Sequence, residues 1–168
     1  FKQKTAYEIR LSLVGSEMCI RDRGNWLAAS FPNMYGSGTG ANNMSGKTNA
    51  QVAASFLTKF NVTGQKLDAQ VMAVALALYS TNSTLAGGSY AAGYGFAVSS
   101  GGIGGRTFNI GSSGAAFGVS NNTNRSITNI LKAANQRAVG GSLWNGDTTL
   151  RTQANSVFDG INVQGDIV

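Results

Sequence analysis

The longest apolar stretch of the chain runs from Leu67 to Ser80 (LDAQVMAVALALYS) and has no polar face. A helix that is apolar all round is buried by its neighbours, so this stretch predicts the central helix of a packed domain. Its apolar run is about a dozen residues long, whereas a membrane-spanning helix needs about 20. We therefore expect a core helix here, and no transmembrane segment.

Three further stretches have apolar residues at helical spacing. The first begins at Thr48, where Thr48-Asn49-Ala50-Gln51 fits a capping box and predicts a helix start. The second runs from Ser126 to Val139, and the third follows Asp147, a residue type that caps helices. Each stripe predicts an amphipathic helix that packs on the central one. The stripes consist of Val52, Ala53, Phe56, Leu57 and Phe60, then Ile127, Ile130, Leu131 and Ala134, then Leu150, Ala154, Val157, Phe158 and Ile161.

Proline, glycine and asparagine predict the breaks between these helices. Trp26 to Ala29 has the pattern of a helix tail that ends at Pro32, because a proline disfavours the helical conformation of the residue before it. We expect the start of that helix to be missing from the chain. Asn61 to Gly64 should end the first amphipathic helix, Gly140-Gly141 should end the second, and Trp144-Asn145-Gly146 should form a turn.

Between Leu85 and Val119 glycine becomes frequent, and the pattern changes to the period of two that is typical of β-strands. The alternating apolar positions are Tyr94, Phe96 and Val98, followed by Phe108 and Ile110. Ser99 to Gly105 (SSGGIGG) lies between them as a turn, which predicts a β-hairpin, with room for a third short strand near Phe117. Because a lone hairpin is marginally stable, it should lie on the helices. The predicted fold class is therefore α+β, a mostly α-helical single domain with a small glycine-rich β-hairpin.

Two loops rich in glycine, asparagine and serine are the candidate contact surfaces of this domain. The first covers Gly36 to Gly46 and the second covers Ser99 to Gly105. Loops of this kind run over protein surfaces and often carry binding residues. The candidate surface-contact residues are Gly36, Asn42, Asn43, Ser99, Gly101 and Gly105.

The first 23 residues differ in character from the rest. Lys2 to Arg23 (KQKTAYEIRLSLVGSEMCIRDR) resembles the translation of a sequencing adapter, with Met18 to Arg23 similar to a transposon end read in one frame. Segments that come from DNA handling are excluded from fold reasoning. We therefore expect residues 1–23 to be a non-native segment that contributes little to folding. The domain itself is expected at 24–168, truncated at its N-terminus.

Without that segment, the composition excludes several kinds of chemistry. Residues 24–168 contain no Cys, His or Glu, and their eight basic and four acidic residues give a net charge of +4, against +6 for the whole chain. The absence of Cys and His excludes the usual zinc sites, and a Ser–His–Asp triad lacks its base. No cofactor is expected. The high isoelectric point owes something to the first 23 residues, so it is weak support for a nucleic-acid partner.

Two motifs fit known chemistry only in part. Ala41 to Thr48 (ANNMSGKT) matches a relaxed phosphate-binding loop, but no apolar strand precedes it and Thr48 is explained as a helix cap. Asp147 and Asp159 are the one pair of carboxylates in one region that could serve a glycosidase. Their ordinary roles are a helix cap and a solvated helix face. We therefore expect neither motif to be a catalytic site.

Charged residues elsewhere are expected to be solvated. Arg125, Lys132 and Arg137 are placed on one helix and Arg151 on the next, but no aromatic residues are interleaved with them for stacking on bases. A solvated polar face is the commoner meaning, so nucleic acid is not an expected partner. The four acidic residues Asp68, Asp147, Asp159 and Asp166 are scattered, whereas calcium needs clustered oxygen ligands.

Several segments of the chain resemble a module of large bacterial surface proteins. They are GNWLAASFPNMYG, GANNMSGKTNAQVAASF, KLDAQVMAVALALY, SSGAAFGVSNNT and LRTQANSVFDGIN. The proteins concerned carry tandem immunoglobulin-like or SdrD-B-type repeats, with the module near the C-terminus. The resemblance covers nearly all of 24–168 and implies no catalytic residues. A Gly-Phe-Trp-containing segment precedes the position of Trp26 in that module, whereas here the adapter-like segment does.

These observations favour a non-catalytic structural or adhesive module of a secreted or cell-surface bacterial protein. The expected partners are other domains of a larger surface protein, and cell wall or glycan. Low charge and many small polar residues are common in such proteins. One alternative is a fragment of a hydrolase, or an enzyme accessory domain, whose active site lies in missing upstream sequence. A further alternative is an oligomerisation unit.

Overall fold

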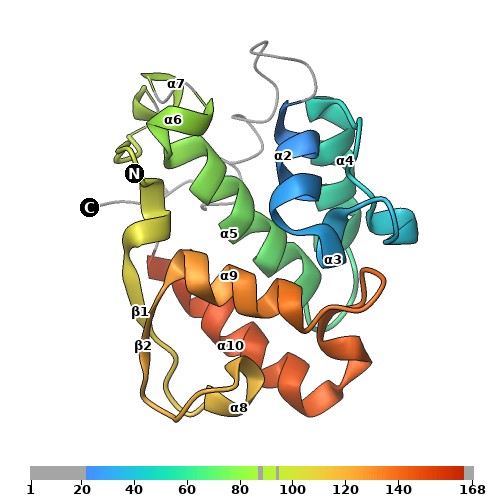
Figure 1. Cartoon of the computed structure of the whole chain (residues 1–168), viewed down its shortest axis with the longest axis vertical. Helices are drawn as coiled ribbons and strands as arrows, with labels where there is room; N and C mark the ends of the chain where they lie inside the picture. The colour runs from blue at the N-terminus through green and yellow to red at the C-terminus, as the bar shows by residue number, and fades with distance from the viewer. Residues whose placement is uncertain (1–21, 87–88, 94, 165–168) are drawn as a thin grey trace.

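Helices dominate the computed structural model, which describes residues 22–86, 89–93 and 95–164 (Figure 1). The longer helices are α2 (Asp22–Ser30), α4 (Asn49–Phe60), α5 (Leu67–Thr81), α9 (Ile127–Gln136) and α10 (Thr148–Gln164). The short helices are α3 (Pro32–Tyr35), α6 (Ser83–Ala86), α7 (Ser89–Ala92) and α8 (Gly114–Phe117), and the 3-10 turns are η1 (Gly40–Asn42), η2 (Gly102–Gly105) and η3 (Leu143–Gly146). A small antiparallel sheet completes the fold. The predicted fold class, α+β and mostly helical, is confirmed.

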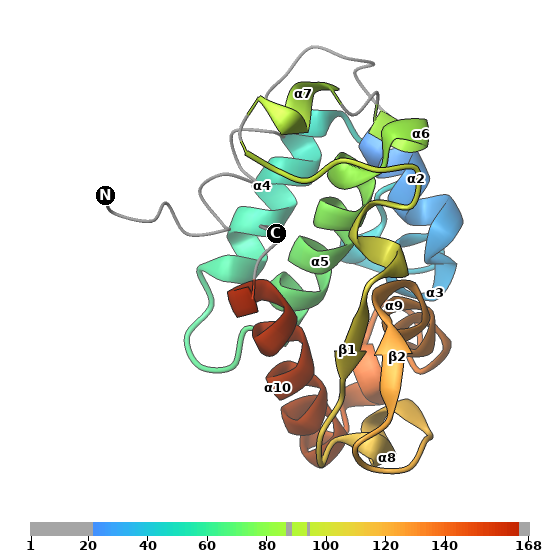
Figure 2. The ribbon, with the colours of Figure 1, turned by 90° about the vertical axis from the view of Figure 1, so that its left-hand side faces the viewer.

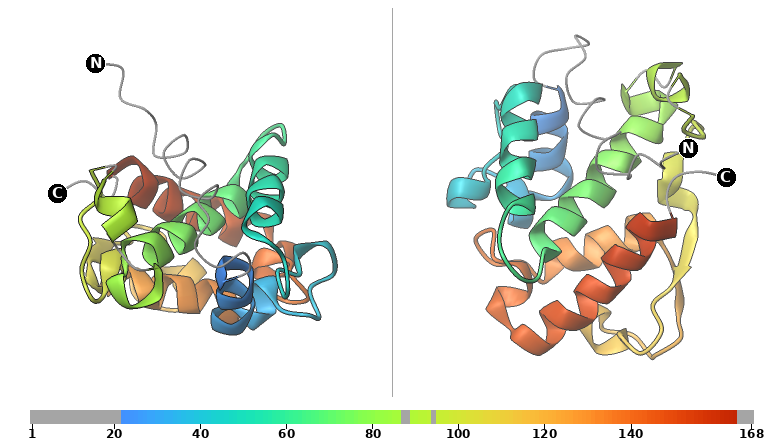
Figure 3. Two further views of the ribbon diagram at one scale, coloured as in Figure 1. Left: turned by 90° about the horizontal axis from the view of Figure 1, so that it is seen from above. Right: turned by 180° about the vertical axis from the view of Figure 1, so that it is seen from behind.

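Helix α5 is the core of the domain. Of its 15 residues 13 are buried, so the prediction of a central helix from its apolar pattern is confirmed. It packs against α10, α4, α9, α2 and η2, and Figure 3 shows it running between α4 and α10. Alanines at 69, 73, 75 and 77 are all buried and let these neighbours approach the helix backbone closely. No helix among the described residues is long and apolar enough to cross a membrane.

The start of α4 has the predicted capping box. The Thr48 hydroxyl accepts a hydrogen bond from the Gln51 N–H (3.2 Å), and the Gln51 side-chain oxygen accepts one from the Thr48 N–H (2.9 Å). These two bonds satisfy donors that have no partner inside the helix. The apolar stripe behind the box is only partly buried. Val52 and Phe56 are buried, but Leu57 is 39 % exposed, so its predicted place in the core is wrong.

The Thr48→Ala variant is expected to lower the free energy of unfolding by about 1 kcal/mol, because the first turn of α4 loses its side-chain acceptor. Chemical denaturation of the two proteins measures this difference. Thr58→Ala is the matched control, since Thr58 is exposed in the last turn of the same helix and its hydroxyl donates to Ala54 O (3.0 Å). Equal losses in both variants would contradict the capping role.

The β-sheet forms from different segments than the sequence predicted. Strand β1 (Thr107–Asn109) pairs with β2 (Asn124–Ser126), with Phe108 opposite Arg125 (Figure 2). The predicted first strand of the hairpin, 94–98, is not a strand over its described residues 95–98, and Tyr94 lies outside the described part of the chain. Phe117 ends the short helix α8 and is not in a strand. The predicted hairpin is therefore wrong in its pairing.

The end of α5 explains why the predicted pairing does not form. Ser99 donates its N–H to Thr81 O (3.1 Å) and accepts a hydrogen bond from the Ser83 N–H (2.9 Å). These bonds hold the Ser99–Gly105 segment against α5, where it turns into η2 and does not reverse the chain as a hairpin. Strand β1 then finds its partner beyond α8, and the Ile127 N–H extends the ladder by donating to Arg106 O (2.9 Å).

The predicted start of the third amphipathic helix, α10, is confirmed, whereas the second, α9, ends earlier than predicted. Asp147 caps α10, since its carboxylate accepts a hydrogen bond from the Leu150 N–H (2.8 Å). The predicted turn is present, with Trp144 and Asn145 at φ values of 50° and 48°. Helix α9 ends at Gln136, before the two glycines predicted to stop it. Gly140 and Gly141, at φ values of 55° and 87°, instead form a tight turn.

The N-terminal helix α2 includes the end of the adapter-like segment. Only Asp22 and Arg23 of that segment lie within the described residues, and they form the first turn of α2. Arg23 is buried, with 8 % of its surface exposed, and the small contribution of residues 1–23 to folding stays a prediction that unfolding midpoints with and without them would test. The predicted helix at Trp26 to Ala29 is confirmed. Gly24 packs closely, because a Cβ atom there would lie 2.6 Å from Met44 O.

Candidate functional site

An open groove with a volume of about 560 Å³ lies between α2, the C-terminal end of α5, η2 and α9. Its apolar wall comes from Trp26, Phe31, Leu78 and Leu85, and its polar wall from Ser30, Asn82, Ser126, Thr128, Asn129 and Lys132. The backbone of Gly101, Gly104 and Gly105 forms the remainder of the lining. Lys132 is the one charged residue among these lining residues, and no carboxylate is present. We call this surface the α2–α9 groove.

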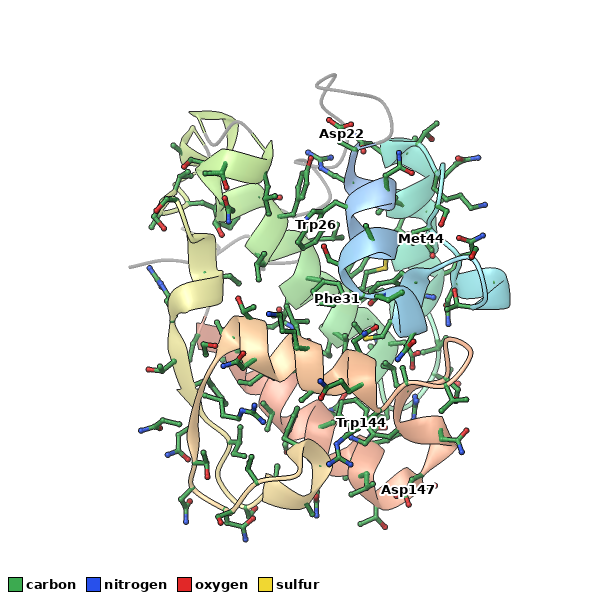
Figure 4. All side chains as sticks on the ribbon, viewed as in Figure 1. Asp22, Trp26, Phe31, Met44, Trp144 and Asp147 are labelled. Atoms are coloured by element: carbon green, nitrogen blue, oxygen red, sulfur yellow. The ribbon has the colours of Figure 1, made fainter. Side chains whose placement is uncertain are left out.

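The aromatic wall of the α2–α9 groove is held in place by ring packing. The half-buried Trp26 ring lies 5.6 Å from the Phe31 ring at an interplanar angle of 89°, and 5.1 Å from the Tyr79 ring at 55°. Such edge-to-face and tilted arrangements are favourable for aromatic pairs. Figure 4 shows Trp26 and Phe31 on the side of α2 that faces α5. The groove therefore has a preformed aromatic surface.

The glycines of η2, and Gly101 just before it, play two different roles at the groove. A Cβ atom on Gly104 would lie 2.5 Å from Thr128 Oγ1 and 2.9 Å from a Leu78 methyl carbon, so a side chain there would push η2 away from α5 and α9. The Thr128 hydroxyl donates a hydrogen bond to Gly104 O (3.0 Å), which fixes the turn. At Gly101 and Gly105 a Cβ atom would meet nothing within 4 Å. These two glycines leave the groove open without being required for packing.

The two loops predicted to be contact surfaces differ in the exposure of their residues. Ser99, Gly101 and Gly105 are exposed, and the last two line the α2–α9 groove. Gly36 is buried, so the prediction that it is a surface-contact residue is wrong, and a Cβ atom there would lie 2.5 Å from Pro32 O.

Asn42 and Asn43 are half-buried and hold the first loop together. Asn42 donates to Gly141 O (3.0 Å), and the Asn43 side chain accepts from the Ser45 N–H (2.9 Å). This loop lies against the Gly140–Gly141 turn, and its residues are not among those that line the groove. The fold therefore does not combine the two loops into one surface.

The carboxylates considered for catalysis have structural contacts and lie far apart. Asp147 caps α10, and Asp159 accepts a hydrogen bond from Gln70 Nε2 (2.7 Å). Twelve residues of α10 separate the two, which corresponds to about 18 Å of helix rise and is far beyond the spacing of a glycosidase pair. Asp68 forms an ion pair with Arg151 (2.7 Å). Asp166 lies outside the described residues, and among 22–164 as described no group of acidic residues could hold a metal ion.

The prediction that Arg125, Lys132 and Arg137 share one helix is wrong for the two arginines. Arg125 lies in β2 and donates a hydrogen bond to Phe117 O (3.3 Å), while Arg137 follows the end of α9. Arg151 is paired with Asp68, and only Lys132 of the four lines the groove. The candidate phosphate-binding loop also has a structural explanation. Thr48 caps α4, and the element before α4 is the 3-10 turn η1 and not a strand.

Sequence reasoning did not identify the groove residues of α2 and α9. Trp26 looked like part of a helix tail, and Asn129 and Lys132 looked like a solvated helix face. They belong to one surface because α9 crosses α5 next to η2, a tertiary arrangement that no local pattern reports. No known protein-family model, curated protein or solved structure matches the chain.

Proposed function

We propose that this chain is a non-catalytic structural or adhesive module of a secreted or cell-surface bacterial protein, and that the α2–α9 groove binds a glycan of the cell wall or cell surface. The observation that carries this proposal is the composition of the groove: a packed aromatic wall faces amides, hydroxyls and one lysine, with no carboxylate among the lining residues. The acidic residues Asp68, Asp147 and Asp159 do not line the groove, and each has a structural contact elsewhere.

A glycan matches both walls of the groove. The apolar face of a sugar ring packs on an aromatic ring such as Trp26, and its hydroxyls both donate and accept hydrogen bonds. An asparagine amide offers two donors and an acceptor, and a lysine offers three donors. Asn129 and Lys132 are three residues apart on α9 and therefore lie on the same face of the helix. Sites that combine an apolar lining with a few polar groups are typical of small-ligand recognition.

Three substitutions test the groove without disturbing its core. Asn129→Ala and Lys132→Ala change exposed residues, and each is expected to weaken glycan binding about three- to tenfold, the effect of one lost hydrogen bond. Gly105→Leu should abolish binding, because the new side chain enters open space in the groove. Gln136→Ala, also exposed on α9 but outside the lining, is the matched control.

Binding is measured with cell-wall fragments and surface glycans on an array, followed by titration of the best ligand. Binding that is unchanged in Gly105→Leu would contradict the groove as the contact surface. Turnover of a glycan that is lost when Asp147 or Asp159 is replaced would contradict a non-catalytic module and favour the hydrolase alternative.

A further inference from the structure

Outside the groove, polar side chains from several elements meet at one place. Tyr35 of α3, Asn42 of η1, Lys59 of α4 and Asp68 of α5 line a small gap whose other walls are Met34, Gly141 and Leu143. We call these four polar residues the Lys59 cluster. Lys59 Nζ donates a hydrogen bond to Asn42 Oδ1, and Asn42 Nδ2 donates to Gly141 O (3.0 Å). A lysine amine is thus in direct contact with the side-chain amide of an asparagine.

The surroundings of Lys59 favour a reactive amine. Burial lowers the pKa of Lys59, while the charge of Asp68 opposes this shift in part. A lower pKa raises the fraction of neutral amine, which is the nucleophilic form. Burial also raises the pKa of the Tyr35 hydroxyl, with the Asp68 charge acting in the same direction, so Tyr35 stays a neutral phenol. The Asp68 carboxylate is held by Arg151 (2.7 Å).

We propose that Lys59 and Asn42 form an intramolecular isopeptide bond. The lone pair of Lys59 Nζ attacks Asn42 Cγ and forms a C–N bond. The bond between Cγ and Nδ2 of Asn42 then breaks, and the nitrogen leaves as ammonia. The attacking nitrogen loses one proton and the departing nitrogen gains one, and the Asp68 carboxylate, which lines the same gap, mediates this transfer. The products are a secondary amide and one ammonia, and the step needs no oxidant, reductant or other reactant.

Such a bond has a clear structural consequence. Asn42 lies in the Gly36–Gly46 loop and Lys59 lies in the last turn of α4, so the bond closes a covalent ring across the capping box at Thr48. A covalent link between this loop and helix α4 limits local opening of the loop. This inference does not depend on the groove or on its ligand.

Mass spectrometry of the whole protein tests the proposal. The protein is expected to be lighter than its sequence by one ammonia. Trypsin cuts after Arg23, Lys47 and Lys66 but not after an acylated Lys59, so the fragments 24–47 and 48–66 should appear as one branched peptide. Loss of ammonia at Asn145-Gly146, a sequence prone to imide formation, leaves these two fragments separate and would not produce the branched peptide.

Substitutions test the role of each residue in the proposed reaction. Lys59→Arg and Asn42→Ala should remove the branched peptide, and Asp68→Asn should slow its formation while leaving both reacting residues in place. Lys66→Arg is the matched control, because Lys66 lies over the Phe60 ring (4.2 Å) and not in the cluster. Recovery of separate, full-mass fragments 24–47 and 48–59 from the unaltered protein would overturn the proposal, whatever the variants do.

Discussion

Replacement of Phe158 by alanine is expected to lower the free energy of unfolding by about 3–5 kcal/mol, the largest loss for any single substitution considered. Phe158 is fully buried on α10, and its ring lies 6.2 Å from the Phe117 ring. Helix α10 is the main neighbour of α5, so the shortened side chain would leave a cavity beside the central helix. Rigid packing around α5 prevents the neighbours from filling that cavity, and the lost contacts are not regained.

Chemical denaturation of the Phe158→Ala protein measures this loss. Val163→Ala is the control, because Val163 belongs to the same helix but is 77 % exposed, and its replacement should change stability by less than about 0.5 kcal/mol. Since domains of this size are stable by about 5–15 kcal/mol, the Phe158 variant should have a visibly lower unfolding midpoint. Similar midpoints for the two variants would show that α10 does not pack on α5 as described.

The second large effect is expected at Gly102, where alanine should lower the free energy of unfolding by about 2 kcal/mol or more. The backbone φ of Gly102 is +56°, a conformation that costs about 1–2 kcal/mol for a residue with a Cβ atom. That atom would also lie 2.6 Å from Thr81 Oγ1 and 2.9 Å from Asn82 N. Thr81 cannot move aside easily, because its hydroxyl donates to Ala77 O (2.7 Å) and accepts from the Ile103 N–H (2.9 Å).

Gly101→Ala and Gly105→Ala are the controls for the Gly102 variant. Neither glycine has a positive φ, and a Cβ atom at either position meets no heavy atom within 4 Å. Thermal unfolding should therefore separate Gly102→Ala from both controls. If Gly102→Ala is as stable as they are, η2 does not sit on the end of α5 in the way that shapes the groove.

The candidate groove could be predicted from the sequence only along one side. Gly101 and Gly105 were recognised because a glycine-rich loop is a local feature of the sequence. Trp26 and Lys132 were not, because they reach the groove from helices more than 100 residues apart. The Lys59 cluster has the same character, since Tyr35, Lys59 and Asp68 belong to three helices and nothing in the sequence spacing brings them together.

The sequence by itself determined the features that depend on neighbours within a few residues. The apolar run of α5 requires burial whatever surrounds it, and the caps at Thr48 and Asp147 use hydrogen bonds that span three residues. Tertiary structure decided which strands pair and which surfaces remain open. Strand β1 pairs with β2 because Ser99 is held at the end of α5, and the groove exists because α9 crosses that same end. Both outcomes depend on contacts between segments that are distant in the sequence. A local sequence pattern does not report the free energies of such contacts.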